Sequence, residues 1–303
     1  MAQAPLTFPL KPKRRLVGLA YGSIHSARRG SGSDVAGSRP YRRGDDVKAI
    51  DWPASAKLSR ARGLDEFVVR EHFADEAPRS VVLCDRRPSM SLYPPGWPWL
   101  EKPRALNAIL RLIEDSSRAV QGYVGYLDHG SGDALWQPPQ SQRTLRGLES
   151  ERPFEAPADA LERGLEELIR HRRDVPAGTF VFVISDFLTP LARTLWLRVL
   201  ARRWDVIPVV VQDPVWEQSF PDVGGIVIPF LDPGTGAMSY VELTHREVAG
   251  RRQANEERRA QLLRTLRGFD LEPVLVETSD VKGALSAFLA WAERRRHARG
   301  RSW

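Results

Sequence analysis

Two hydrophobic patterns alternate over residues 78–295. Short apolar runs such as Ser80–Asp85 and Thr179–Ser185 are continuous and rich in β-branched residues, as in strands buried on both faces of a parallel sheet. Between such runs, apolar residues recur every three or four positions, as along one side of a helix, for example over Pro103–Gln121 and Ala158–Arg172. The alternation predicts an α/β fold, with a doubly wound, mostly parallel sheet and helices on both faces.

The chain divides into regions of different character. Residues 1–76 are polar and rich in glycine and arginine, with few long apolar segments. We therefore expect a smaller, irregular, β-containing module over 1–76, the α/β domain over 77–295 and a basic tail over 296–303.

The second half of the domain contains a predicted hairpin and a long helix. Two short apolar segments, Ile226–Phe230 and Met238–Leu243, flank the turn sequence Asp-Pro-Gly-Thr-Gly, as is typical of antiparallel strands. Thr244 followed by Glu247 forms a capping-box pattern, so a helix is expected to begin there.

Asp85 and Asp186 each stand at the carboxyl end of a predicted buried strand. In open parallel sheets, ligands bind at the carboxyl ends of the strands, near the switch in strand order. The two carboxylates are therefore candidates for one shared site. The alternative is that each serves its own loop, because loops favour aspartate for local reasons.

The net charge is +7, and the excess of arginine gathers at Lys11–Arg15, Arg28–Arg43 and Arg294–Arg301. Such stretches suit a nucleic acid, an anionic membrane surface or an acidic protein, and they also occur on solvated faces that have no partner. The apolar runs are too short to span a bilayer, and the N-terminus lacks the core of a signal peptide. We expect a soluble, cytoplasmic protein.

Sequence motifs of several enzyme classes are absent. The chain has no phosphate-binding Gly-x-x-x-x-Gly-Lys pattern, no Gly-x-Ser-x-Gly elbow and no His-Glu-x-x-His pair. Its single cysteine, Cys84, lies in an apolar run and is expected to be a buried small hydrophobe. We expect a protein that is not an enzyme, so that any ATPase would be a separate chain.

The N-terminal region and the start of the α/β domain resemble a known family. Residues 37–52, GSRPYRRGDDVKAIDW, look like the signature of DUF58 proteins, and so do residues 55–57 and 69–71. The similarity continues into Val81–Met90, where these proteins begin a von Willebrand factor A-like domain, and Asp186 fits the next landmark. The length resembles that of the smaller, MxaS-like members.

This resemblance implies a fold, a partner and a site. The fold would be a von Willebrand factor A-like domain with an inserted or preceding β-rich segment. Genes of the family commonly accompany MoxR-type AAA+ ATPases, and the group is thought to assist the assembly, maturation or metal insertion of client complexes. A-type domains bind proteins through a metal ion held by an Asp-x-Ser-x-Ser loop, a threonine and a further aspartate, a set of oxygen ligands that suits magnesium.

The metal-site motif (MIDAS) is degenerate in this chain. Under the resemblance, Asp85, Ser89 and Asp186 match three ligand positions, whereas Arg87 stands at the first serine and Ala158 near the threonine. A guanidinium is a permanent cation and cannot coordinate a metal. Arg87 either pairs with both aspartates in place of the metal or points to solvent. No cofactor is expected, and Mg²⁺ is the ion that the three surviving ligands would hold if one is bound.

A second candidate site is the motif loop within residues 39–52. Its candidate residues are Arg39, Tyr41, Gly44, Asp45, Asp46, Asp51 and Trp52. One interpretation is a binding loop with Tyr41 and Trp52 as aromatic anchors. The other, which the mixture of charges favours, is a loop held by Arg–Asp pairs and Asx turns, with Trp52 inside the core.

These observations favour a non-enzymatic adaptor or an assembly and maturation factor. It would work with a MoxR-type AAA+ ATPase on a client complex, through a binding face formed by Asp85, Arg87, Ser89 and Asp186. The alternative is a basic nucleic-acid-binding protein. Against it, glutamates interrupt the arginines of the helix that follows Thr244, so that no clean basic stripe forms.

Overall fold

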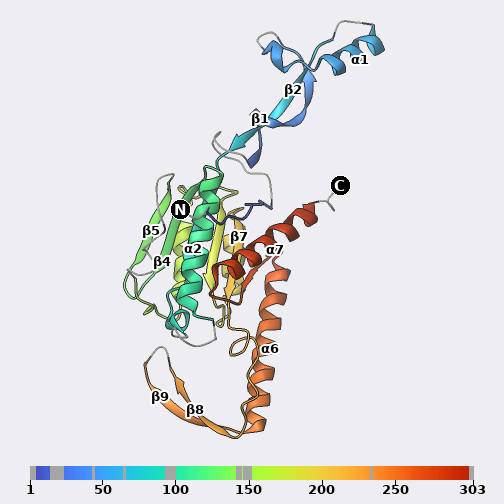
Figure 1. The fold of residues 1–303 in the computed structure, drawn as a ribbon. Coiled ribbons are helices and arrows are strands. Elements are labelled where there is room, and N and C mark those ends of the chain that lie inside the picture. Colours follow the sequence, from blue (N-terminus) through green and yellow to red (C-terminus); the bar gives the residue numbers. More distant parts are fainter. Residues whose placement is uncertain are drawn as a thin grey trace.

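A six-stranded sheet forms the centre of the molecule (Figure 1). The computed structural model describes residues 5–13, 24–42, 45–63, 66–92, 100–140, 145, 152–232 and 235–299. The strands of the sheet are β3 (Arg79–Cys84), β4 (Tyr123–His129), β5 (Ala134–Gln140), β6 (Phe180–Ser185), β7 (Asp205–Val211) and β10 (Val274–Val276). The continuous apolar runs seen in the sequence become β3, β6 and β7, which are almost wholly buried.

The strand order in space is β10-β7-β6-β3-β4-β5. All neighbouring pairs are parallel except β4 with β5, so β5 is an antiparallel edge strand. Numbered along the chain within the sheet, this is the order 3-2-1-4-5-6, in which the chain reverses direction across the sheet between β3 and β6. The expected mixed α/β architecture with a mostly parallel sheet is confirmed.

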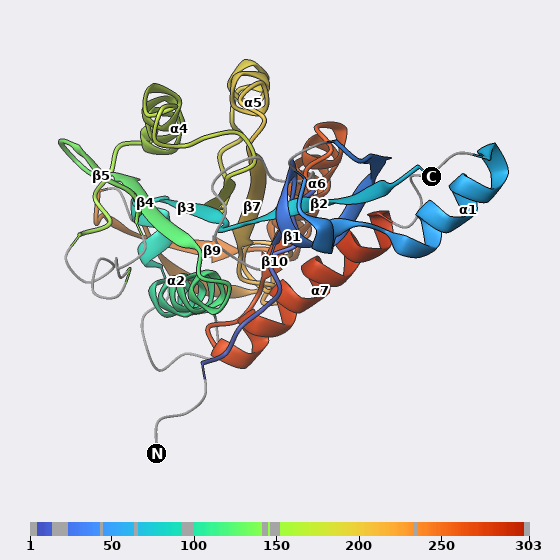
Figure 2. The same cartoon turned by 90° about the horizontal axis from the view of Figure 1, so that it is seen from above.

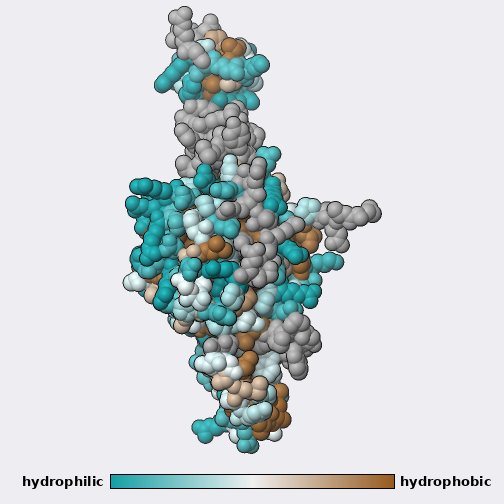
Figure 3. All heavy atoms as spheres, turned by 90° about the vertical axis from the view of Figure 1, so that its left-hand side faces the viewer, coloured by the Kyte–Doolittle hydropathy of each residue, from teal (hydrophilic) through white to brown (hydrophobic). Residues whose placement is uncertain are grey.

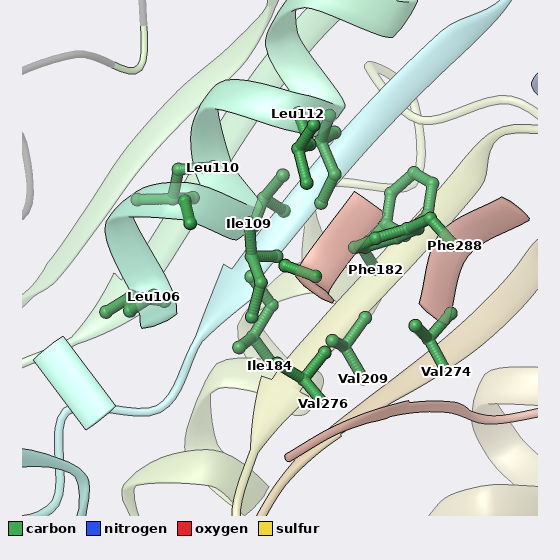
Figure 4. Close-up of a cluster of buried hydrophobic side chains, with 14 of the residues drawn as sticks. Leu106, Ile109, Leu110, Leu112, Phe182, Ile184, Val209, Val274, Val276 and Phe288 are labelled. Atoms are coloured by element: carbon green, nitrogen blue, oxygen red, sulfur yellow. The ribbon is translucent and has the colours of Figure 1, made fainter. Parts of the chain in front are cut away.

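Helices cover both faces of the sheet, as Figure 2 shows from above. On one face lie α2 (Lys102–Ala119) and α7 (Val281–Arg299), and on the other lie α4 (Ala160–Arg170), α5 (Arg193–Leu200) and the end of α6 (His245–Gly268). Figure 4 shows how the first face packs: Leu106 and Ile109 of α2 lie beside Phe182 and Ile184 of β6. Among the described residues, no helix is long and apolar enough to cross a membrane.

The N-terminal residues 5–13 belong to this core. Phe8 is 3% exposed and stacks on Phe288 of α7, with ring centroids 4.3 Å apart, and Leu10 joins the same cluster. The sequence assigned the whole of 1–76 to a separate module. That boundary fails for residues 5–13, because Leu6, Phe8 and Leu10 alternate with polar residues and prolines over only five positions, too short a pattern to indicate where they pack.

A two-stranded antiparallel arm precedes the sheet and projects away from it (Figure 1). It consists of β1 (Ile24–Pro40) and β2 (Val68–Glu76), whose pairing shifts register at several points. Between them lie the 3-10 turn η1 (Val47–Ala49) and α1 (Trp52–Arg62). We call residues 38–42, 45–63 and 66–70 the arm tip. The arm is the β-containing module that the sequence predicted, but it starts after residues 5–13.

A hairpin of β8 (Ile226–Leu231) and β9 (Met238–Leu243) follows β7. Its inward side packs on a small cluster that includes Phe220 and Val248. The capping box of Thr244 and Glu247 is formed, and α6 begins at the next residue, as predicted. Helix α7 runs on to Arg299, so the basic residues just after 295 continue a helix and do not begin a separate tail.

The direction of the parallel strands places the arm and the hairpin at opposite ends. The arm leads into the amino end of β3, whereas the hairpin leaves from the carboxyl end of β7. Because β3 and β7 run the same way in one sheet, these two ends face opposite directions. Figure 1 shows this arrangement, with the arm above the sheet and the hairpin below it.

We expect Phe8→Ala to lower the free energy of unfolding by about 3 to 5 kcal/mol, because it empties a packed aromatic site. Urea titration followed by circular dichroism measures the change. Leu6→Ala is the matched control, since Leu6 is 40% exposed. Equal, small effects of the two substitutions would show that the N-terminal segment is not part of the core.

Candidate functional site

The candidate site lies at the carboxyl ends of β3 and β6, where the strand order switches. Asp85 follows β3, while Ser185 ends β6 and Asp186 follows it. The backbone N–H of Asp85 donates to the carbonyl of Ile184 at 2.9 Å, which holds the loop after β3 against β6. The structure therefore brings Asp85 and Asp186 to the same edge of the sheet.

The guanidinium of Arg87 lies between these carboxylates. Its Nε is 2.9 Å and its Nη2 is 2.6 Å from Oδ2 of Asp85, and Nη2 is 3.4 Å from Oδ1 of Asp186. The hydroxyl of Ser185 also donates to Oδ2 of Asp85, at 2.7 Å. Arg87 is 7% exposed. Of the two arrangements considered from the sequence, the structure shows the paired one, and Arg87 does not point to solvent.

A second buried cation, Lys102, completes the arrangement. It is the first residue of α2 and its side chain is fully buried. Its Nζ lies 3.2 Å from Oδ2 of Asp186 and 2.5 Å from Oε1 of Glu217, and it donates to the backbone carbonyl of Ser89 at 3.0 Å. Lys102 thus ties together the loops that follow β3, β6 and β7. We call Asp85, Arg87, Lys102, Asp186 and Glu217 the ionic cluster.

Asp186 is ionised although it is buried. Burial alone would raise its pKa, but the Lys102 ammonium, a hydrogen bond from Ser89 and the Arg87 guanidinium outweigh burial and hold the pKa below its usual value. The backbone N–H of Leu188 donates to Oδ1 as well. Because the folded-state pKa is lowered, Asp186 stabilises the fold above its ordinary pKa of 3.8, and this contribution is lost as the pH falls through the folded-state value.

For Glu217, burial outweighs the nearby cation, so its pKa lies above the usual value. Burial raises its pKa, and the nearby Lys102 ammonium only partly offsets this effect. Its Oε2 accepts the backbone N–H of Asp213 at 2.8 Å, and Asp213 in turn accepts the N–H of Leu100. The loop after β7 is therefore folded around its own carboxylates and presents one of them to Lys102.

A second charged network lies beside the ionic cluster. The Nε of Arg86 is 3.2 Å from Oδ2 of Asp128, and its Nη2 donates to the Tyr126 hydroxyl at 2.7 Å. Arg152 donates to the other oxygen of Asp128 at 2.9 Å, and the ring of Phe154 lies against Arg86. Burial holds the pKa of Tyr126 well above its usual value, so its hydroxyl keeps the proton that it donates to Asp128.

These residues do not fit a divalent cation. Both oxygens of Asp85 and both oxygens of Asp186 already accept hydrogen bonds, chiefly from the Arg87 guanidinium and the Lys102 ammonium. The loop of Ala158 does approach, since the N–H of Ala156 donates to the carbonyl of Arg86, but Ala158 brings no side-chain oxygen. A magnesium ion would meet the charges of Arg87 and Lys102 at close range.

The motif loop forms the arm tip, at the other end of the molecule. Arg39 makes a two-pronged pair with Asp45, both contacts at 2.6 Å. That pair and the backbone N–H of Arg42 lower the pKa of Asp45 to about 2. Asp51 caps α1 through the N–H of Ala54 and pairs with Arg70 at 2.7 Å. The loop is thus held by Arg–Asp pairs and local carboxylate hydrogen bonds.

Trp52 is not in a core, contrary to the interpretation that the sequence favoured. It is 57% exposed and touches Phe67 edge to face, with ring centroids 5.9 Å apart. Tyr41 meets the same Phe67 ring from a distance of 6.5 Å. Asp46 accepts the backbone N–H of Lys48 and so begins η1. Gly44, the remaining motif-loop candidate, lies outside the described residues. At the arm tip α1 lies against β2 and buries Ser55 and Val69, but this small layer leaves the indole of Trp52 outside.

A comparison with protein families covers both of these regions. The family described as "Protein of unknown function DUF58" matches residues 37–263, which is most of the chain and includes the motif loop and the ionic cluster. The chain belongs to the DUF58 family.

Three mycobacterial proteins, each described as an uncharacterized protein, are similar to this DUF58 protein. Proteins of Mycobacterium bovis and Mycobacterium tuberculosis are 28% identical to it over 273 residues, covering 88% of this chain and 82% of theirs. Among solved structures, an uncharacterized membrane spanning protein from Vibrio fischeri is 12% identical, with a TM-score of 0.20 over 63% of this chain and 100% of that one. A score this low carries no argument about fold.

Sequence reasoning found only part of the DUF58 site. It named Asp85, Arg87, Ser89 and Asp186 but missed Lys102, Glu217 and the network around Asp128. Asp128 falls in β4 just after an apolar run, so the rule that picked out the other two aspartates would have found it. Lys102 carried no such signal, because a lysine beside a helix-starting proline is ordinarily exposed.

Lys102→Met should lower the free energy of unfolding by about 3 to 5 kcal/mol at neutral pH, because it leaves the buried Glu217 without its cation and Asp186 with only the more distant Arg87. In this variant the pKa of Glu217, which burial already raises, should rise further, and the pKa of Asp186 should rise as well. The folded state then binds protons more readily, so the loss shrinks as the pH is lowered.

Urea titrations of wild type and variant at neutral and mildly acidic pH measure this dependence. Lys57→Met, which removes an exposed lysine of α1, is the matched control. A loss that is independent of pH would mean that Lys102 contributes by packing alone.

Proposed function

We propose that this DUF58 protein is a non-enzymatic adaptor, acting as an assembly or maturation factor. It works with a MoxR-type AAA+ ATPase on a client complex. The partner assignment rests on the family resemblance. The geometry of the site supports a role that does not involve catalysis, because the carboxylates of the ionic cluster are neutralised within the protein.

The observation that carries the proposal is the internal neutralisation of the candidate site. Each of the three carboxylates of the ionic cluster is paired with Arg87 or Lys102, so none of the three is free to act as a general base or a metal ligand. Cys84 is buried, and burial raises the pKa of its thiol to about 12, which keeps it unreactive. A site of this kind fixes the shape of three loops.

We assign the domain to the von Willebrand factor A-like fold. Support comes from the sheet, in which the carboxyl ends of β3 and β6 adjoin and carry Asp85 and Asp186. In A-type domains this edge holds a metal ion and binds a protein partner. Here Arg87 and Lys102 take the place of the metal charge, and the ionic cluster is buried, so a partner would contact the loops around the cluster, which stay in one arrangement whether or not divalent ions are present.

The surface next to the cluster suits a protein partner. The loop that contains Glu217 leads directly into the β8–β9 hairpin, and Arg258 of α6 holds that loop through the carbonyl of Glu217. The outer side of the hairpin exposes large apolar side chains, among which Tyr240 is 74% exposed. Figure 3 shows apolar side chains at the surface at this lower end of the molecule. Exposed apolar patches of this kind mark interaction surfaces.

Nucleic acid is the weaker candidate partner, because arginines of α6 are engaged within the molecule. Arg252 and Arg258 donate to backbone carbonyls, Arg259 pairs with Glu277, and Arg251 lies over the rings of Phe220 and Phe230. Side chains used in this way are not arranged along one face to follow a phosphate backbone.

Calorimetry with Mg²⁺ tests metal independence. We expect no tight, stoichiometric binding by the wild type. Arg87→Ser alone should not restore full affinity, because Lys102 still pairs with Asp186 and Ala158 still lacks an oxygen. Tight binding of one Mg²⁺ per wild-type chain would overturn the account of the site.

Affinity purification from the native cell, with identification by mass spectrometry, tests the partner. We expect a MoxR-type ATPase or its client complex to be recovered with the wild type and lost with Tyr240→Glu, which places a charge on the exposed face. Arg173→Glu is the matched control, because Arg173 is exposed at the amino end of β6. Recovery that is equal for both variants, or that lacks any ATPase, would contradict the proposal.

A further inference from the structure

The arm tip exposes an apolar cluster. Val47 and Trp52 are each 57% exposed and Phe67 is 44% exposed. The rings of Trp52 and Tyr41 both meet that of Phe67, so these three side chains form one cluster, drawn from the start of α1 and from the residues that flank β1 and β2; Val47 adds a further exposed apolar side chain to the same tip. Figure 3 shows apolar atoms among hydrophilic ones at this upper end of the molecule. Within the part of the chain that the structure describes, these rings contact one another but remain largely open to solvent.

The cluster sits on a fixed frame. Pairs of Arg39 with Asp45 and of Arg70 with Asp51 close the loop on two sides. The Ser55 hydroxyl accepts the N–H of Val68 and joins α1 to β2. A surface that is already ordered loses little conformational freedom when it binds, which favours its use as a binding site.

The charge around the cluster is positive. The described carboxylates of the tip are all engaged: Asp45 and Asp51 as above, Glu66 with Arg62, and Asp46 with the N–H of Lys48. Four cations remain exposed and form no ion pair with any described residue: Arg42, Lys48, Lys57 and Arg60. Two of them adjoin the apolar cluster along the chain, since Arg42 follows Tyr41 and Lys48 follows Val47.

We propose that the arm tip is a docking site for an acidic protein segment that also carries apolar side chains. The apolar residues of that segment pack on Trp52 and Phe67, while its carboxylates pair with the surrounding cations. Tryptophan, tyrosine and arginine are the residues most often found at the energetic centres of protein interfaces. Complementary charge at the rim speeds association and selects the partner.

The tip suits a protein better than a membrane or a nucleic acid. A helix that lies in a membrane interface needs a continuous apolar side, whereas α1 (WPASAKLSRAR) offers only Trp52 and Leu58 as large apolar residues. Nucleic-acid surfaces present a stripe of cations. Here the exposed cations flank an apolar cluster, and the Trp52 and Phe67 rings meet at 79° and so do not form a parallel stacking platform.

A labelled peptide tests this inference without knowledge of the natural partner. The probe is a fluorescein-labelled peptide in which glutamate alternates with leucine and phenylalanine, and its binding to the full chain is followed by fluorescence anisotropy. We expect saturable binding that weakens as salt is added. Trp52→Ala and the double change Lys57→Glu, Arg60→Glu should each weaken it about tenfold or more.

Two matched controls separate the tip from general stickiness. Leu197→Ala removes a comparably exposed apolar side chain, 52% exposed, from α5, and Arg246→Glu reverses an exposed charge on α6; neither should change binding. Circular dichroism checks that each variant is folded. The inference is overturned if Trp52→Ala binds the probe as the wild type does. It is also overturned if the tip substitutions instead abolish retention on phosphatidylserine vesicles or single-stranded DNA while leaving peptide binding intact.

This test is independent of the adaptor proposal. The arm tip and the ionic cluster lie at opposite ends of the sheet, and the tip variants leave the hairpin and the cluster untouched. Failure of the peptide to bind at the tip would leave the result with Tyr240→Glu unaffected, and the reverse also holds.

Discussion

The pairing of Arg87 and Lys102 with three buried carboxylates is the interaction on which the carboxyl edge of the sheet depends. Removing charges from water is costly, and a buried ion pair often adds little net stability compared with apolar residues of the same shape. The main effect of these ion pairs is to select one conformation of the loops that carry the carboxylates. Asp85, Asp186 and Glu217 come from three separate loops, and each loop has to adopt one conformation if its carboxylate is to reach a cation. The ions therefore impose an arrangement that apolar packing at this edge would leave less defined.

Much of the fold could be predicted from the sequence because buried parallel strands and amphipathic helices leave local patterns. Strands β3, β6 and β7 are continuous apolar runs, and α4 shows the apolar periodicity of a half-buried helix. The two aspartates of the site could be predicted for the same reason, since they stand where such runs end. Lys102 could not, because its partners are 84 and 115 residues away, and nothing near it in the chain indicates that it is buried.

From the sequence, residues 5–13 are assigned to the N-terminal module and Trp52 to a core. Both predictions are wrong, and they have a common physical origin. Phe8 packs on a helix near the other end of the chain, whereas Trp52 contacts the ring of Phe67 and is otherwise mostly exposed. An aromatic residue in an irregular segment buries itself only if a second layer happens to cover it, and that depends on tertiary structure, not on the residues beside it. The expectation that a tryptophan marks a core holds for layered domains, and it fails for the arm, where one short helix on a two-stranded ribbon buries only small side chains such as Ser55 and Val69.

The length of the arm sets how the two ends of the molecule relate to each other. The six residues of β2 below the arm tip, residues 71–76, at about 3.3 Å each, hold the tip roughly 20 Å beyond the amino edge of the sheet, and the sheet itself separates that edge from the ionic cluster. A domain of ordinary size, about 30 Å across, therefore cannot contact both ends at once. Two different molecules can occupy the two ends without competing for space. The two bound molecules are then held close to each other. The effective concentration of one near the other is set by the length of the arm and not by their abundance in solution.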